Sequence, residues 1–176
     1  MKNMFVMVLA VSLASVAYAA EDVVTAIHGS VEKIDSTART VSLKTDDGMH
    51  HSVHFVDGTA VHGADAGREA SKDSWHGLKE GSEVVVHFTT RGTEETAIEI
   101  DKVGDGGLNS TEGAVKGIDR GGRTLVIGTK DGSDETFRLT EHASKDAGKG
   151  VAKGANVTVF YTETAGKKVA HFFNPT

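Results

Sequence analysis

An internal repeat is the feature that most constrains the fold of this chain. Residues 29–48, GSVEKIDSTARTVSLKTDDG, align without gaps with residues 113–132, GAVKGIDRGGRTLVIGTKDG, at a constant offset of 84. Two further segments, which begin at Leu78 and Val151, also align, but at an offset of 73. The first copy therefore carries an insertion of eleven residues near 64–76. A repeat of this length predicts two copies of one small structural unit.

The repeat also predicts where the domains begin and end. We expect the first unit at residues 23–103 and the second at residues 111–173. Between them, residues 104–110 read GDGGLNS, a composition typical of a flexible linker.

The first twenty residues are typical of a secretory signal peptide. One lysine precedes an apolar run that begins at Met4, and the segment ends in Ala-Tyr-Ala. The apolar run is too short to span a bilayer comfortably. We therefore expect a signal peptide at residues 1–20, cleavage near residues 19–20, and a periplasmic or secreted product without a membrane span.

The absence of cysteine excludes disulfides and thiolate metal sites.

Composition favours an all-β fold. The chain has 21 glycines, one proline and many Val and Thr residues, which suits short strands joined by glycine turns. The formal net charge of −6 argues against a nucleic-acid partner.

The register of the first hairpin in each copy can be predicted. A two-residue turn would place the apolar residues of its two strands on opposite faces of the sheet. A three-residue loop at 46–48, with glycine in the left-handed conformation, instead pairs Val41 with Val53. The same loop in the second copy places Leu125 opposite Phe137.

Alternation of apolar and polar residues predicts one buried and one wet face for these strands. Five short strands, with a gap or a helix between the third and fourth, favour a closed barrel because closure removes the exposed strand edges. We therefore predict an all-β protein of two tandem five-stranded OB-like small barrels, with Leu78 and Val151 closing one barrel end. The expected core is Val41, Leu43, Val53, Phe55, Val84, Val86 and Phe88 in the first copy, and Leu125, Ile127, Phe137, Leu139, Val157, Val159 and Tyr161 in the second.

The pattern G-x-V-x-x-I-D, then T-V/L-x-L/I, D-G and L-x-x-G-x-x-V-x-V resembles a family of exported bacterial small-barrel domains of unknown function. The resemblance covers nearly the whole mature chain, and it implies a fold rather than an activity. The architecture is also similar to the periplasmic OB-fold copper-binding component of silver and copper efflux systems. That resemblance implies a metal site of Met, Trp and His. Here the only methionine outside the leader is Met49, and Trp75 lies in the insertion, so those ligands do not match.

Histidines are the candidate metal ligands. The chain has nine, and seven of them lie in the first copy, which is also the more acidic one. Imidazole suits Zn, Cu and Ni. His50 and His54 share a strand face but lie about 13 Å apart at normal strand rise, so one ion cannot bridge them. A site needs cross-strand or loop partners, and we select His54, His62, His76 and His87. The alternative interpretation is that these are solvated surface histidines.

The insertion contains the only tryptophan of the chain, Trp75. A tryptophan in an exposed loop can contact a ligand or a partner, but more often such a residue covers the open end of its own barrel. Residues 66–76 are long enough for one or two helical turns.

No catalytic motif is present: G-x-S-x-G, H-E-x-x-H and a phosphate-binding loop are all missing. Asp35 and Asp119, which follow the first strand of each copy, are expected to cap turns. The sequence therefore favours a non-enzymatic periplasmic or secreted binding module, with a divalent transition metal as candidate ligand and no other cofactor. The alternative is a structural or interaction protein of the cell envelope that uses its barrel surfaces.

Overall fold

The structure, a computed structural model, describes residues 24–63, 77–146 and 151–176. The signal peptide expected at 1–20 and the expected helical turns at 66–76 lie outside these ranges. Within the described ranges, no helix is long and apolar enough to cross a membrane.

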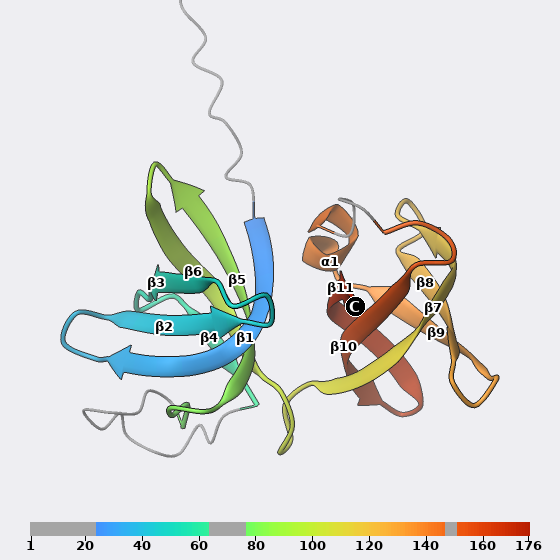
Figure 1. Ribbon diagram of the computed structural model, residues 1–176, viewed down its shortest axis with the longest axis horizontal. Helices are drawn as coiled ribbons and strands as arrows, with labels where there is room; N and C mark the ends of the chain where they lie inside the picture. Colours follow the sequence, from blue (N-terminus) through green and yellow to red (C-terminus); the bar gives the residue numbers. More distant parts are fainter. Residues whose placement is uncertain (1–23, 64–76, 147–150) are drawn as a thin grey trace, which may run out of the picture.

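The first repeat forms a six-stranded sheet in the order β3-β2-β1-β5-β6-β4 (Figure 1). A parallel pairing of β3 with β6 closes five of these strands into a ring. The short strand β4 pairs with the same edge of β6, further along, and was not predicted. The strands are β1 (Val24–Asp35), β2 (Thr40–Thr45), β3 (His50–His54), β4 (Ala60–His62), β5 (Glu83–Arg91) and β6 (Glu94–Lys102).

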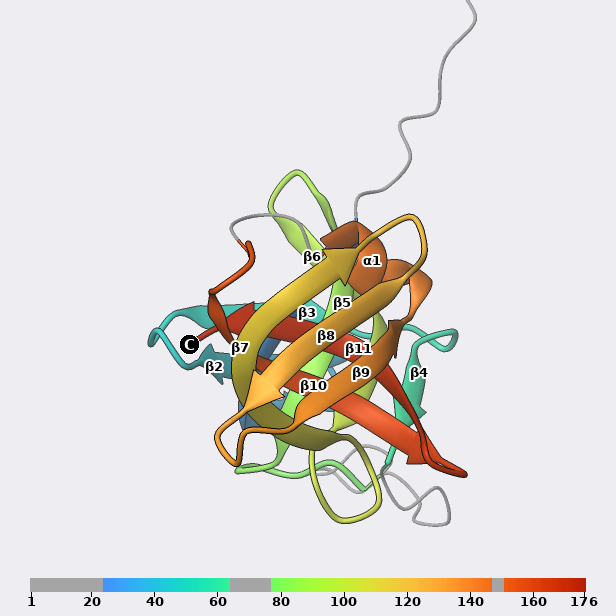
Figure 2. The same cartoon turned by 90° about the vertical axis from the view of Figure 1, so that its right-hand side faces the viewer.

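The second repeat is a closed barrel in the order β10-β11-β9-β8-β7 (Figures 1 and 2). Its strands pair in the same order as the ring of the first repeat, including the parallel closure of β9 with β11. The prediction of two tandem OB-like barrels is confirmed. The elements are β7 (Asn109–Asp119), β8 (Thr124–Thr129), β9 (Asp134–Leu139), α1 (Glu141–Asp146), β10 (Asn156–Thr164) and β11 (Lys167–Pro175).

The hairpin register follows the turn chemistry. Val41 lies opposite Val53, and Leu125 lies opposite Phe137, as predicted. The glycine that ends the first loop, Gly48, has a φ of 81°, in the region that other residues rarely adopt.

An aspartate caps the first turn of each repeat. The Oδ1 atom of Asp35 accepts hydrogen bonds from the backbone N–H groups of Thr37 and Ala38, at 3.0 and 2.8 Å. Asp119 accepts one from Gly122 at 2.8 Å. The predicted capping role of both aspartates is confirmed.

Each barrel has its own apolar core, as predicted. All seven residues expected in the first core are buried. Six of the seven expected in the second are buried too, while Tyr161 is partly buried and packs against that core. Leu78 and Val151 are buried members of these two cores.

A third apolar cluster joins the two barrels. It consists of Val85 on β5, Leu108 in the connecting segment and Phe160 on β10, which are 0, 2 and 3% exposed. The ring of Phe160 stacks on His28 of β1 and on Phe172 of β11, with ring centroids 4.5 and 6.0 Å apart. The outer faces of β5 and β10 therefore pack against each other.

The connection between the barrels is a tight, hydrogen-bonded turn. The N–H of Gly107 donates to the carbonyl oxygen of Gly104 at 2.9 Å. The N–H of Leu108 donates to the carbonyl oxygen of Lys102 at 2.8 Å. A Cβ on Gly107 would overlap the Lys102 carbonyl oxygen, and one on Gly63 would overlap the Cα of Gly107. These close approaches place the end of β4 against the connection.

The cluster between the barrels makes a testable prediction. Phe160 belongs to neither barrel core, so Phe160→Ala should loosen the coupling of the barrels while each barrel stays folded. A buried Phe→Ala change costs about 3–5 kcal/mol. We expect scanning calorimetry to resolve two unfolding transitions in the variant and one in the wild type. As a control, Ile98→Ala at a position 37% exposed should change stability by only about 0.5 kcal/mol. A single transition at the wild-type temperature in Phe160→Ala would contradict this role.

Candidate metal site between the barrels

Three potential metal ligands meet where β4 pairs with β6. Ligand atoms of His62, Glu99 and Asp101 all lie within 4.8 Å of one another. His62 Nδ1 is 2.8 Å from Asp101 Oδ1 and 3.0 Å from Glu99 Oε1. The register explains this grouping, because His62 lies opposite Asp101 in the parallel β4–β6 pairing. Glu99 and Asp101 are two residues apart on β6 and so point to the same face.

The second barrel contributes to the same place. Thr162 of β10 and His171 of β11 line a cavity of about 250 Å³ together with His62, Asp101 and the connecting segment. His171 Nδ1 lies 3.7 Å from Asp101 Oδ2, and its Nε2 is hydrogen-bonded to the Thr162 hydroxyl at 3.1 Å. The group therefore sits at the junction of the two barrels.

Burial makes Asp101 an unusual carboxylate. Its side chain is 1% exposed, and its Oδ2 has no hydrogen-bond partner among the described residues. Burial raises the pKa of Asp101, and so does the charge of Glu99, while the hydrogen bond with His62 opposes the rise. A buried carboxylate that stays only partly compensated favours a nearby cation.

The pKa of His62 is raised as well, which for a histidine favours the charged form. Burial by itself lowers its pKa, but the hydrogen bond and charge of Asp101, together with Glu99, outweigh that effect and raise the pKa. His62 therefore holds its proton more readily than a free histidine does.

The candidate ligands selected from the sequence are placed differently. His62 belongs to the group, and His87 lies on the same side of the first barrel, opposite Glu99 in the β5–β6 register. His54 is exposed on β3 and does not belong to it. His76, like Trp75, lies outside the described residues.

Sequence reasoning missed Glu99, Asp101 and His171. One signal pointed to them: the segment EVVVHF of β5 is apolar on both faces, which indicates that its outer face is covered. The alternating acids of the neighbouring AIEID segment on β6 then fall beside that covered face.

His87 is the most deeply buried histidine of the described chain, at 2% exposure. Neither of its ring nitrogens has a hydrogen-bond partner among the described residues. Its ring lies 5.8 Å from that of His142 on α1, measured between centroids. Burial lowers the pKa of His87 to about 4; the charge of Glu99 opposes this, and His142 and His171 add to it.

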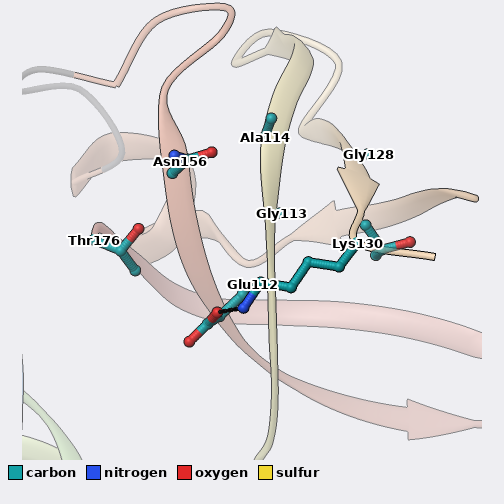
Figure 3. Close-up of a pocket in the computed structure, with 8 residues that line it drawn as sticks. Glu112, Gly113, Ala114, Gly128, Lys130, Asn156 and Thr176 are labelled. Atoms are coloured by element: carbon teal, nitrogen blue, oxygen red, sulfur yellow. Dashed lines mark hydrogen bonds and ion pairs between the residues drawn. The ribbon is translucent and has the colours of Figure 1, made fainter. Parts of the chain in front are cut away.

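A larger hollow of about 350 Å³ lies on the second barrel, away from these groups (Figure 3). Lys130 reaches across it to Glu112, with 2.6 Å between Nζ and Oε2. Its remaining lining is mostly glycine, alanine and threonine. The carboxylate side chain of Glu112 is already paired with Lys130, so this hollow offers no set of side-chain metal ligands.

Comparison with known proteins gives likenesses in fold only. No family model and no curated protein matches the chain. Among solved structures, CusF with Ag(I) is 17% identical with a TM-score of 0.35, over 45% of this chain and 96% of CusF. Apo-CusF from Escherichia coli is 16% identical with a TM-score of 0.37, over 51% of this chain and 98% of CusF. A single-stranded DNA binding protein from Thermus aquaticus is 14% identical with a TM-score of 0.26, over 87% of this chain and 93% of that protein. At these values no residue role passes to this chain.

The lowered pKa of His87 predicts acid sensitivity. Between pH 6.5 and 4 the unfolded chain takes up a proton at this residue and the folded chain does not, so folding stability falls as the pH falls. The loss is about 1.4 kcal/mol per pH unit, or roughly 3 kcal/mol in total. We expect urea unfolding in the presence of chelator to show this loss in the wild type relative to His87→Gln. Parallel stability curves for the two proteins would contradict the prediction.

Proposed function

We propose that this chain is an exported, non-enzymatic module that binds a divalent transition metal ion through His62, Glu99 and Asp101. The observation that carries the proposal is the convergence of three ligand atoms within 4.8 Å. Ligands of one zinc ion lie about 2.0–2.2 Å from it and hence roughly 3–3.5 Å from each other. The distances of 2.8 and 3.0 Å from His62 Nδ1 to the two carboxylates are close to that spacing.

The donor set favours a particular class of ion. One imidazole and two carboxylates, without thiolate, suit Zn²⁺, with Cu²⁺ and Ni²⁺ as competitors for the imidazole. His171 is the candidate for a fourth ligand, since its Nδ1 lies 3.7 Å from Asp101 Oδ2. The hydrogen bond of Thr162 to the other ring nitrogen would hold that imidazole in position.

Electrostatics supports the same proposal. A cation at this place would contact the Oδ2 of Asp101, which has no hydrogen-bond partner among the described residues. It would also compensate the charges of Asp101 and Glu99, whose side chains are only 1 and 20% exposed. The proposal of export rests separately on the signal peptide that the sequence of residues 1–20 predicts.

The interaction alternative has weaker support. Within the described ranges, the large hydrophobic side chains that are exposed are Met49, Val56 and Ile98, which come from three different segments. Scattered apolar side chains of this kind are normal on a protein surface. Self-association in sizing chromatography, without metal uptake, would favour this alternative.

Calorimetric titration tests the metal site. We expect the untagged, chelator-treated protein to bind Zn²⁺ with a Kd below about 100 µM. His62→Ala and Asp101→Asn each remove a ligand and should weaken this binding at least about tenfold. His54→Ala is the matched control, since it removes an exposed imidazole outside the group and should leave binding unchanged.

Two outcomes would contradict the proposed function. One is the absence of any uptake tighter than about 100 µM for Zn²⁺, Cu²⁺ and Ni²⁺. The other is an equal loss of affinity in His54→Ala and His62→Ala, which would indicate diffuse binding to surface histidines.

A further inference from the structure

Unpartnered nitrogen atoms collect where β5 of the first barrel faces α1 of the second. Both ring nitrogens of His87, which is 2% exposed, lack a hydrogen-bond partner among the described residues. The Nδ1 atom of His142 is also buried and without a partner in the described chain. In folded proteins nearly all buried polar atoms have a hydrogen-bond partner. Three buried nitrogens without one at the same place therefore indicate a bound ligand.

The two rings are spaced for a shared metal ion. Their centroids are 5.8 Å apart and their planes are inclined by 48°. Because a metal ion lies about 2.0–2.1 Å from an imidazole nitrogen, two imidazoles on one ion have centroids roughly 5–6.4 Å apart. The observed spacing falls inside this interval.

Glu99 supplies a carboxylate next to His87. It stands directly opposite His87 in the antiparallel β5–β6 register. Its Oε1 atom contacts His62, and a carboxylate has a second oxygen that can serve another cation.

We propose that His87 and His142, with Glu99, form a second transition-metal site that joins the two barrels. Its ligands make it a site for a dication of the Zn²⁺ class that accepts imidazole nitrogen. This site lies beyond the one in the proposed function, because its two histidines come from β5 and α1 and neither belongs to the His62 group. It also assigns a role to His142, a residue of the second repeat.

Metal stoichiometry tests the proposal. Zn²⁺ is titrated into the untagged, chelator-treated protein, and bound metal is measured after gel filtration. We expect two equivalents in the wild type, one in His142→Ala, one in His62→Ala and none in the double variant. His50→Ala, which changes an exposed histidine on β3, should retain two. Circular dichroism checks that each variant is folded.

The outcomes separate the two sites. Two equivalents in His142→Ala would overturn the second site, as would a wild type that binds one equivalent lost only in His62→Ala. Loss of one equivalent in His142→Ala but none in His62→Ala would support the second site and contradict the proposed function.

A second measurement does not depend on any variant. In the wild type, the NMR signals of the His87 and His142 rings should shift together during uptake of one equivalent of Zn²⁺. If the His87 ring signals remain unchanged up to two equivalents, the second site is overturned.

Discussion

The burial of two apolar outer faces against each other determines the chemistry of this protein. Val85 and Phe160 point away from their own barrel cores and meet at Leu108. Strand alternation then places polar residues of the same faces, such as His87 and Asp101, in the shielded zone between the barrels. Removal of water strengthens every charge interaction there and makes unpartnered polar atoms costly. The contact that joins the barrels thus also creates the desolvated setting of the proposed cation site.

Most of the fold could be predicted because its signals are local. Hairpin register depends on a turn sequence and an alternation of period two, so the pairing of Val41 with Val53 was accessible from the sequence. Strand β4 could not be predicted from the sequence, because a segment of three residues shows no periodicity. Its conformation depends on parallel pairing with β6, a strand distant in the sequence. Helix α1 lies between the third and fourth strands of the second repeat, where a gap or a helix was predicted, but six residues are too few for the sequence pattern to decide between the two.

The candidate sites were predictable only in part. Residue type and local context selected His62 and His87, both of which the structure places beside acidic groups of β6. Asp101 and His142 escaped because their positions depend on long-range events: the β4–β6 pairing for Asp101 and the docking of one barrel on the other for His142. Seven of the nine histidines lie in the first repeat, so residue counts favoured that repeat alone, whereas the candidate site at the junction draws on both repeats.

The tight turn at Gly104–Leu108 has a consequence for how the barrels associate. Short tethers hold two partners at an effective concentration on the order of millimolar or more, and closing a short loop costs little entropy. The second barrel is therefore present near the first at a high effective concentration, whatever the concentration of the protein in solution. A contact of a few side chains around Phe160, too small to hold two free proteins together, can then persist. Each barrel can therefore carry polar side chains at its docking face, because the short connection reduces the apolar area that association needs.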